Sequence, residues 1–254
     1  MQLEVSNWML VFLRVGAFLL ALPFFSSTNI PATIRVALAA LLALLLAPTL
    51  PPFAAGQLPL CSLLGVMAQE VAIGLLLAFV SRMVFYAVDL AGNVVATELG
   101  LNMGAILNPL EQDSSPVPGT ILFYLAAVVM LTLDLHHWML VGFQQTYSVL
   151  PVGGAHLNGE LFADFVARAN RIFIIGLQIS APVLAVSFVI TLVFAVLSRA
   201  VPQMNVFQLS FSFRIIGGLA VFGFTLQLTA QYVTNYLHRL PDDLLQVAQF
   251  VGAK

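Results

Sequence analysis

The sequence predicts an all-α protein that is built from hydrophobic helical hairpins and associated with a membrane. Of its 254 residues, 61% are hydrophobic and only 8% are charged, whereas soluble proteins carry about 25% charged residues. The mean hydropathy is +1.02. Apolar runs recur along the chain, several of them near the roughly 20 residues that a helix needs to cross a bilayer, and Pro- and Gly-rich segments separate them.

Charge and cysteine content exclude several classes of protein. The formal net charge of -2 leaves no basic field, so nucleic acid is not an expected partner. Cys61 is the single cysteine, which excludes intrachain disulfides and cysteine metal clusters. The first residues, Met1 to Glu4, lack the basic region that opens a signal peptide, so we expect the N-terminus to be retained.

The first half of the chain divides into three apolar runs. Residues 5–25 form the first, which Pro23 and a polar turn end. The second runs from Pro31 to residue 47 and carries a stripe of small residues at Ala39, Ala43 and Ala47 that favours close helix packing. After a linker with four prolines at 48–59, residues 60–97 form a third run. It exceeds the length that one membrane crossing needs, which predicts a bent helix or two stacked helices with Gly92 as a possible break.

The second half adds further apolar runs, one of which stops at a polar patch at 134–137 and then resumes, and we expect about six long helical stretches in all. Residues 172–197 are the clearest run of membrane-spanning length, and Pro182 is expected to kink it. The tail after residue 236 is polar and then weakly amphipathic. Positive charges lie in nearly every connection, so the orientation in a membrane does not follow from charge. These runs are residues 120–133, 138–150, a run that begins at Asn158 or Gly159 and contains 172–197, and 206–236.

The segment 100–119 interrupts this pattern. Pro109, Pro116 and Pro118 lack backbone donors and disfavour helix at the residues before them, so we expect no helix here. In a membrane protein, non-helical backbone persists only where protein buries it or water reaches it. The segment is therefore either an ordinary aqueous connection or a loop that faces a water-filled path.

Several charged residues lie within or beside apolar runs and are expected to face the protein interior, water or another subunit. A proton or ion relay is one interpretation, and Arg82 and Asp89, seven residues apart, share a helix face. Interhelical pairing or subunit contact is favoured, because no second helix carries a matching row of ionisable groups. The group comprises Arg14, Arg35, Glu70, Arg82, Asp89 and Glu98.

No catalytic or metal-binding pattern is complete. Asp134, His136 and His137 are a fragment of a metal site, but zinc needs three or four ligands, and adjacent histidines on a helix point about 100° apart. We therefore expect a turn at a water interface, with no metal or cofactor. The sequence has no nucleophile elbow, P-loop or dinucleotide fingerprint, so an enzyme is not predicted.

Two sets of soft apolar side chains have alternative interpretations. Met103, between Gly100 and Gly104, is placed either for packing or for a deformable pore lining. The phenylalanines of the last run favour simple packing over a pore lining; they are Phe207, Phe211, Phe213, Phe222 and Phe224.

One stretch resembles a known family signature. The run Arg199-Ala-Val-Pro-Gln-Met-Asn-Val-Phe207 is similar to the signature of the FliR family of flagellar export-gate proteins and of their SctT relatives in non-flagellar type III secretion; its characteristic residues are Arg199, Pro202, Gln203, Met204, Asn205 and Phe207. Arg14-Val15 with Pro23, Pro31 with Arg35, and Gly100-Leu-Asn-Met-Gly104 agree with the family too, so the resemblance covers nearly the whole chain.

Two positions depart from the family pattern. Asn108-Pro109 stands where the family usually has Asp-Pro, which puts a charge-based role of that site in doubt. Ser210-Phe211-Ser212 stands where Gly-Phe-Pro is common, which weakens the expectation of a break in the last helix.

The resemblance implies a non-enzymatic channel subunit with a FliP-like part at about 1–165, including the loop 100–119, and a FliQ-like part at about 166–254. Its partners would be FliP-like, FliQ-like and FlhB-like subunits and unfolded export substrates, in the bacterial inner membrane at the flagellar basal body. Much of that assembly would stand above the bilayer. A loop at 105–118 would help to plug the closed pore, and the constriction would comprise Met103, Ala105, Ile106, Leu107, Asn108, Pro109 and Leu110.

Three alternatives remain open from the sequence. The chain would be an SctT-like subunit of a virulence secretion system, a secondary transporter for small solutes, or a passive scaffold for its neighbours. The transporter would use the central loop as a broken-helix site, but inverted-repeat symmetry and a midplane ion cluster are lacking.

Overall fold

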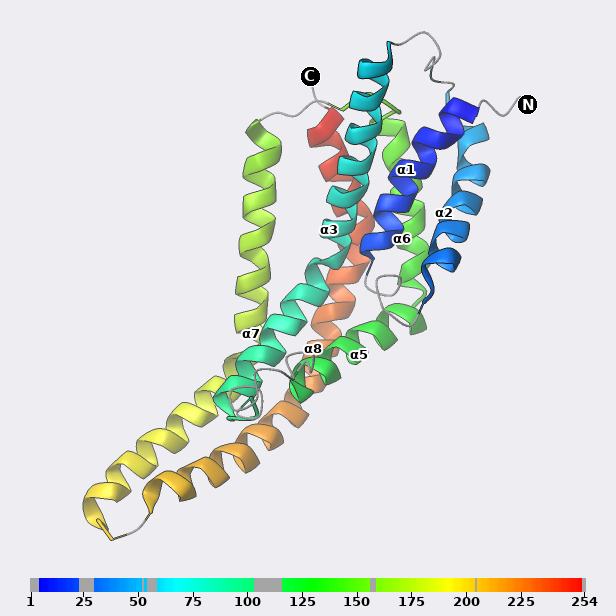
Figure 1. Cartoon of the computed structure of the whole chain (residues 1–254). Helices are drawn as coiled ribbons and strands as arrows, with labels where there is room; N and C mark the ends of the chain where they lie inside the picture. Colours follow the sequence, from blue (N-terminus) through cyan, green and yellow to red (C-terminus); the bar gives the residue numbers. More distant parts are fainter. Residues whose placement is uncertain are drawn as a thin grey trace. The chain divides into compact units, whose positions relative to one another are not determined.

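The computed structural model describes residues 5–22, 30–51, 53, 59–102, 116–155, 159–203 and 205–252, except for the side chains of Glu160 and Phe207. Throughout these ranges the regular secondary structure is helical, so the predicted all-α class is confirmed (Figure 1). The elements are α1 (Val5–Ala21), α2 (Ala32–Leu46), the short 3₁₀ helix η1 (Ala47–Thr49), α3 (Leu60–Glu98), α5 (Val117–Thr132), α6 (Leu135–Val149), α7 (Gly159–Ala200) and α8 (Val206–Gly252).

The chain forms two compact units that alternate along the sequence. Unit 1 comprises Met1–Met83, Leu133–Ala169 and Leu237–Lys254, and unit 2 comprises Val84–Thr132 and Asn170–Tyr236. The long helices α3, α7 and α8 each contribute residues to both units. Each unit is described separately below.

In unit 1, α1 packs along α2 through the predicted stripe of small residues (Figure 1). Ala39 and Ala43 are the buried residues of α2, and Ala47 in η1 is buried as well. Most other residues of α2 stay exposed or half-buried. Because an alanine face lets two helix backbones approach, the packing contact follows directly from the four-residue spacing.

Unit 1 also contains the end of α8, which the sequence placed outside the last helical run. The helix continues through Pro241 to Gly252, beyond the last apolar run predicted at about 206–236. Gly142 of α6 lies against Pro241, and a Cβ added at Gly142 would lie 2.9 Å from the Cα of Pro241, so glycine allows α6 and α8 to approach here. The weak amphipathic pattern of the tail becomes a buried face with helical spacing: Leu237, Leu240, Leu244, Val247, Ala248 and Val251.

In unit 2, the predicted break of α3 at Gly92 does not exist. The helix is continuous from Leu60 to Glu98, 39 residues or about 58 Å. Gly92 serves another purpose, because a side chain there would collide with the backbone of Gly119 in α5. Two facing glycines therefore allow α3 and α5 to touch backbone to backbone, which sequence periodicity alone does not distinguish from a helix break.

Several helices in the described part of the chain are long and apolar enough to cross a membrane. Four qualify individually, within Ala32–Thr49, Leu60–Glu98, Leu161–Ala200 and Gln208–Gly252, and α5 with α6 would form a fifth if the two count as one span. The most apolar windows of the last two helices are only 17% and 11% buried by the rest of the chain. Their apolar surface therefore requires lipid or another protein.

Candidate functional site

The central segment begins at a well-formed helix end in unit 2. Gly100 has φ +68°, a conformation that glycine adopts without steric cost. The amide of Leu101 donates to the carbonyl of Ala96 at 2.8 Å, and the amide of Gly100 donates to Thr97 at 3.1 Å, which together form a Schellman motif. The ring of Phe211 in α8 lies against Gly100 and leaves no room for a side chain.

The segment ends earlier than the sequence indicated. Helix α5 begins at Val117, so Pro118 and Gly119 are helical and the expectation of no helix through residue 119 is wrong there. Proline is compatible with the first turn of a helix, because amides there have no helical partner. Beside this end, a cavity of about 230 Å³ is lined by Asp89, Gly119, Thr120, Phe123 and Tyr124.

The predicted constriction itself lies outside the described residues, which stop at Asn102 and resume at Pro116. This applies to Met103, Ala105, Ile106, Leu107, Asn108, Pro109 and Leu110. The two ends that the structure does describe are both held within unit 2, one by Gly100 and Phe211 and the other by Gly92 and Gly119.

Unit 1 contains a buried ion pair between two helices. Arg14 of α1 and Glu70 of α3 are both 0% exposed. The guanidinium of Arg14 donates from Nε and Nη2 to the two carboxylate oxygens of Glu70, at 2.5 and 3.0 Å. This two-point geometry is the strongest form of an arginine–carboxylate contact.

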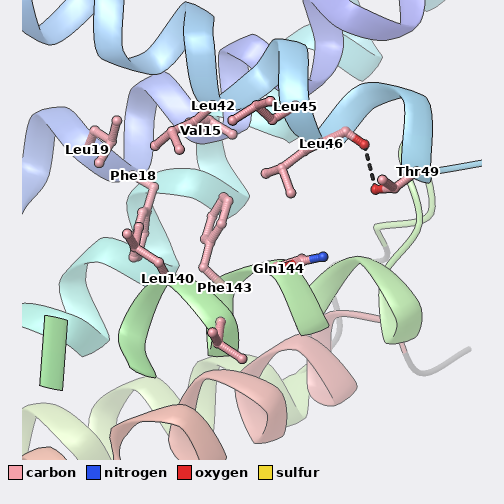
Figure 2. Close-up of a pocket in the computed structure, with 11 residues that line it drawn as sticks. Val15, Phe18, Leu19, Leu42, Leu45, Leu46, Thr49, Leu140, Phe143 and Gln144 are labelled. Atoms are coloured by element: carbon pink, nitrogen blue, oxygen red, sulfur yellow. Dashed lines mark hydrogen bonds between the residues drawn. The ribbon is translucent and has the colours of Figure 1, made fainter. Parts of the chain in front are cut away.

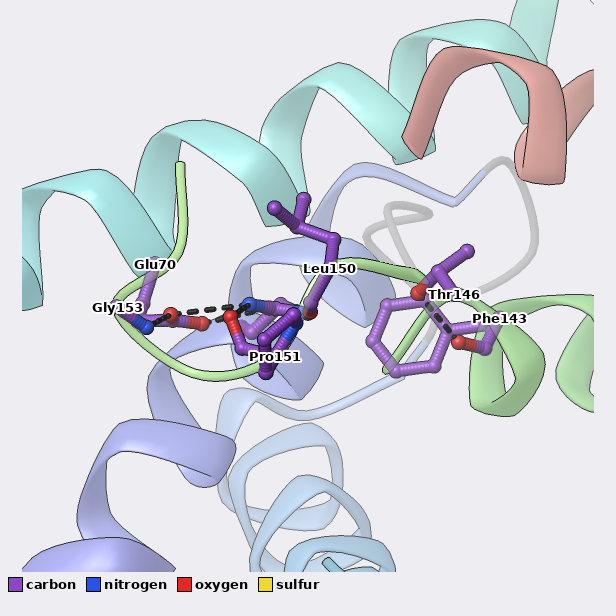
Figure 3. Close-up of polar contacts among 7 residues, drawn as sticks. Glu70, Phe143, Thr146, Leu150, Pro151 and Gly153 are labelled. Carbon is purple, nitrogen blue, oxygen red and sulfur yellow. Dashed lines mark hydrogen bonds and ion pairs between the residues drawn. The ribbon is translucent and has the colours of Figure 1, made fainter. Parts of the chain in front are cut away.

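The ion pair also holds the connection between α6 and α7. Arg14 Nη1 donates to the carbonyl of Leu150 at 2.9 Å, and the amide of Gly153 donates to Glu70 Oε1 at 2.9 Å (Figure 3). The ring of Tyr147 covers the guanidinium, with its centroid 4.3 Å from Cζ. Gly153 has φ +75° and lies against Phe53, so only glycine fits this turn. Three segments distant in sequence are thereby joined at one point.

For Arg14 and Glu70, the contacts favour interhelical pairing over a proton or ion relay. Both charges are neutralised within the chain and their hydrogen bonds end on backbone groups rather than on a second ionisable residue. The sequence indicated both residues as interior charges but not as partners. The sequence did show opposite charges within separate apolar runs, which is compatible with an ion pair. Sequence spacing, however, does not say which helices are in contact.

The other predicted interior charges are less buried. Arg82 is half-buried and donates to the carbonyl of Ala21 at 3.1 Å. Arg35 and Glu98 are half-buried, and Asp89 is exposed. Among the described residues, Arg35, Asp89 and Glu98 form no ion pair.

Unit 1 contains a second buried arginine, Arg168 of α7. Arg168 donates to Asp164 at 2.6 Å, the pair that lies four residues apart in α7. It also donates to Asp243 at 2.9 Å and to Gln246 at 3.0 Å, both in α8. Arg168 thus holds α7 against the end of α8, which the sequence had placed outside the last helical run.

The signature residues extend from the end of α7 across the connecting turn into the start of α8. Arg199, Pro202, Gln203 and Asn205 are exposed, while Met204 and the side chain of Phe207 lie outside the described residues. Asn205 Oδ1 accepts from the amide of Gln208 at 3.4 Å, as the first residue before a helix commonly does. The described signature residues therefore make few contacts within the chain.

Asp134, His136 and His137 lie at the start of α6. Asp134 is left-handed, with φ 53°, and its carboxylate is 3.5 Å from Nδ1 of His137. The two histidine rings lie side by side with centroids 4.1 Å apart. The rings are therefore close together, although adjacent residues on a helix point about 100° apart. Rotation about the side-chain bonds brings the rings together, and one potential ligand atom from each of the three residues lies within 4.8 Å of the others. The two ends of the cluster, Asp134 and His137, remain exposed to solvent, as at the expected polar turn.

An apolar groove in unit 1 lies between α1, α2 and α6. Figure 2 shows Phe18, Phe143 and several leucines along its walls, with Gln144 and Thr49 at one end. Its volume is about 320 Å³. The hydroxyl of Thr49 already donates to the carbonyl of Leu46 at 2.7 Å, so the groove offers few free polar groups.

The described residues thus form an all-helical protein with apolar helices of membrane-spanning length, and they contain no complete catalytic constellation. Comparison with known proteins narrows the class. Residues 5–240 match the family of bacterial export proteins, family 1. The chain is 32% identical to the flagellar biosynthetic protein FliR of Bacillus subtilis over 82% of this chain and 81% of that protein.

Further relatives have the same name. The FliR protein of Caulobacter vibrioides is 31% identical over 92% of this chain and 93% of its own length, and that of Escherichia coli is 28% identical over 87% and 84%. The chain therefore belongs to the FliR family of bacterial export proteins. It is a membrane component of a flagellar export apparatus, and the resemblance of its signature is confirmed.

Proposed function

We propose that this chain is a channel subunit of the flagellar type III export gate. With FliP-like, FliQ-like and FlhB-like subunits it forms the entrance through which unfolded flagellar proteins cross the bacterial inner membrane at the basal body. The observation that carries the proposal is the apolar surface of α7 and α8, which this chain leaves largely uncovered. Membership of the export family is consistent with neighbouring subunits as the cover.

Within the gate, we divide the chain into two parts according to the partner subunit that each part resembles, and this division differs from the two compact units. Residues of about 1–165 take the place of a FliP-like subunit and residues of about 166–254 that of a FliQ-like subunit. The two long helices α7 and α8 with their short turn support the second assignment, because a two-helix hairpin is a self-contained element for side-by-side assembly. Buried charges such as Arg14 and Glu70 then stabilise the subunit, while the less buried Arg35, Arg82, Asp89 and Glu98 face other subunits or water.

Mass spectrometry of the intact detergent-extracted complex, isolated through a tag after Lys254, tests the assembly. We expect one copy of this chain together with several copies of two smaller hydrophobic proteins. A chain that purifies as a stable monomer or homodimer contradicts the proposal and favours the solute transporter.

We propose in addition that residues 105–118 help to close the pore. The support is the firm attachment of both ends of the segment, by Gly100 against Phe211 and by Gly119 against Gly92.

The closing role is tested by replacing residues 105–110 with glycine and serine at constant length. We expect assembled complexes that leak ions and small solutes across the cell membrane. The matched control is a glycine–serine replacement of residues 54–58, in the predicted linker before α3, which should leave permeability unchanged. An intact permeability barrier in assembled 105–110 variants contradicts the closing role.

A further inference from the structure

The hairpin formed by residues 170–236 of unit 2 carries positive charge without any negative charge. It contains three arginines, Arg171, Arg199 and Arg214, and no aspartate or glutamate. Arg171 and Arg199 lie near the two ends of the apolar run of α7, where a long side chain can extend toward water. Arg214 lies inside α8, among apolar residues.

The contacts of Arg214 leave most of its hydrogen-bonding capacity unused. Its Nη2 donates to the hydroxyl of Thr191 in α7 at 2.9 Å. That hydroxyl in turn donates to the carbonyl of Ser187 at 2.7 Å. The Nε of Arg214 is buried and has no hydrogen-bond partner among the described residues. No described carboxylate forms an ion pair with it.

The surroundings of Arg214 are apolar and outward-facing. The neighbouring side chains Phe213 and Ile216 are 56% and 70% exposed, and on α7 Val189 and Leu192 are 56% and 50% exposed. Such a surface is covered by lipid or by protein, and in either medium a charged arginine is costly unless an opposite charge compensates it. The half-buried guanidinium therefore lies at the edge of a surface that is buried in the assembled protein.

The position along the hairpin argues against a lipid headgroup as the compensating group. Thr191, which binds Arg214, precedes Arg199 by eight residues, or about 12 Å along the helix. The guanidinium is thus held well back from the turn, where headgroups would meet the hairpin if it spans a bilayer. A side chain on a neighbouring helix reaches this level directly.

We propose that Arg214 forms an ion pair with a carboxylate on an apolar helix of a neighbouring subunit, and that this pair sets the register of that helix on the α7–α8 hairpin. The occupant is a helix whose surface is aliphatic, to match Phe213, Ile216 and Leu192, and which carries one aspartate or glutamate at the level of Thr191. The inference rests on the proposed function, since it requires a neighbouring subunit.

Charge reversal in the tagged full complex provides the test. We expect Arg214→Glu to lower co-purification of one partner subunit at least about tenfold, because truncating or reversing one member of a buried charge pair mainly increases dissociation. The matched control is Arg199→Glu in the exposed last turn of α7, which should retain the partner. If Arg214→Glu retains the same partners in the same ratio as the unchanged chain, the ion pair does not exist.

Suppressor selection identifies the partner residue. A change from aspartate or glutamate to lysine or arginine in a partner subunit that restores assembly of Arg214→Glu supports the proposal. Restoration by changes at Glu98, Glu111 or Asp113 of this chain overturns it, because the acid would then come from the chain itself.

Photo-crosslinking separates a protein neighbour from lipid. A photoreactive amino acid at Ile216 should crosslink to the same partner polypeptide, whereas crosslinks to lipid alone overturn the proposal. Co-purification with the unchanged chain separates failure of the proposed function from failure of the ion pair. If the unchanged chain purifies without partners, the proposed function is wrong. If the unchanged chain and Arg214→Glu co-purify with the same partners, only the ion pair is wrong.

Discussion

Two arginines of this chain lie among apolar helices under opposite conditions. Arg14 in unit 1 is fully buried, and a carboxylate, a backbone carbonyl and an aromatic ring of the same chain surround it. Arg214 in unit 2 is half-buried, and a single threonine hydroxyl is its hydrogen-bond partner among the described residues. The charge of Arg14 is compensated by a carboxylate of the same chain, whereas we propose that the charge of Arg214 is compensated by a carboxylate of a neighbouring subunit. One residue type thus stabilises the fold in one unit and prepares an interface in the other.

The largest expected effect comes from removing the charge of Glu70. Glu70→Gln leaves Arg14 charged and uncompensated at a site with no solvent contact, which should lower the free energy of unfolding by about 3–5 kcal/mol. Thermal unfolding of the detergent-solubilised chain measures this loss. Asp89→Asn, which changes an exposed carboxylate of the same helix, is the control and should have little effect. Equal melting temperatures for the two variants would contradict the role assigned to the pair.

A smaller loss is expected where α3 meets α5 in unit 2. Gly92→Ala places a methyl group against the backbone of Gly119, and overpacking of this kind costs about 1–3 kcal/mol. Gly65→Ala on the same helix meets no atom within 4 Å and should be neutral or stabilise by up to about 1 kcal/mol. The same unfolding measurement distinguishes them. If Gly92→Ala were as stable as Gly65→Ala, the close approach of α3 and α5 would be wrong.

The turn of the hairpin should tolerate change better. Asn205→Ala removes the side-chain acceptor for the amide of Gln208 at the start of α8, a loss of about 1 kcal/mol. Asn205→Ser retains an acceptor and serves as the control. Hydrogen exchange of the first turn of α8 should increase in the alanine variant alone, and equal exchange in both variants would rule out a capping role.

The smallest effect on the fold is expected at Arg214. Arg214→Gln should change the free energy of unfolding of the isolated chain by no more than about 0.5 kcal/mol, since the half-buried side chain has one hydrogen bond to a described residue to lose. The same variant should weaken assembly. A melting temperature as low as that of Glu70→Gln would show that Arg214 stabilises the fold of the chain, and the contrast between the two arginines would disappear.

Much of the architecture follows from local pattern. The helical class, the start of α7 at Gly159, the polar break before α6 and the packing stripe of α2 were all predicted, because apolar periodicity, proline and small-residue spacing act over a few residues. The errors have physical reasons too. Gly92 resembles a helix break in sequence but supports a close helix contact, and the tail after residue 236 became helical because its apolar residues found a partner surface in unit 1.

The sequence by itself determined the family, the membrane character and the residues with unusual charge, since composition and the signature at 199–207 are properties of the chain read in order. Only the tertiary structure decided which charges meet. Arg14 and Glu70 are 56 positions apart, and Arg168 and Asp243 are 75 apart. Pairing over such separations depends on which helix faces pack together, and many faces of these uniformly apolar helices would pack equally well. Among the described residues, the geometry also left Arg214 without a carboxylate partner, which no count of charges in the sequence would have revealed.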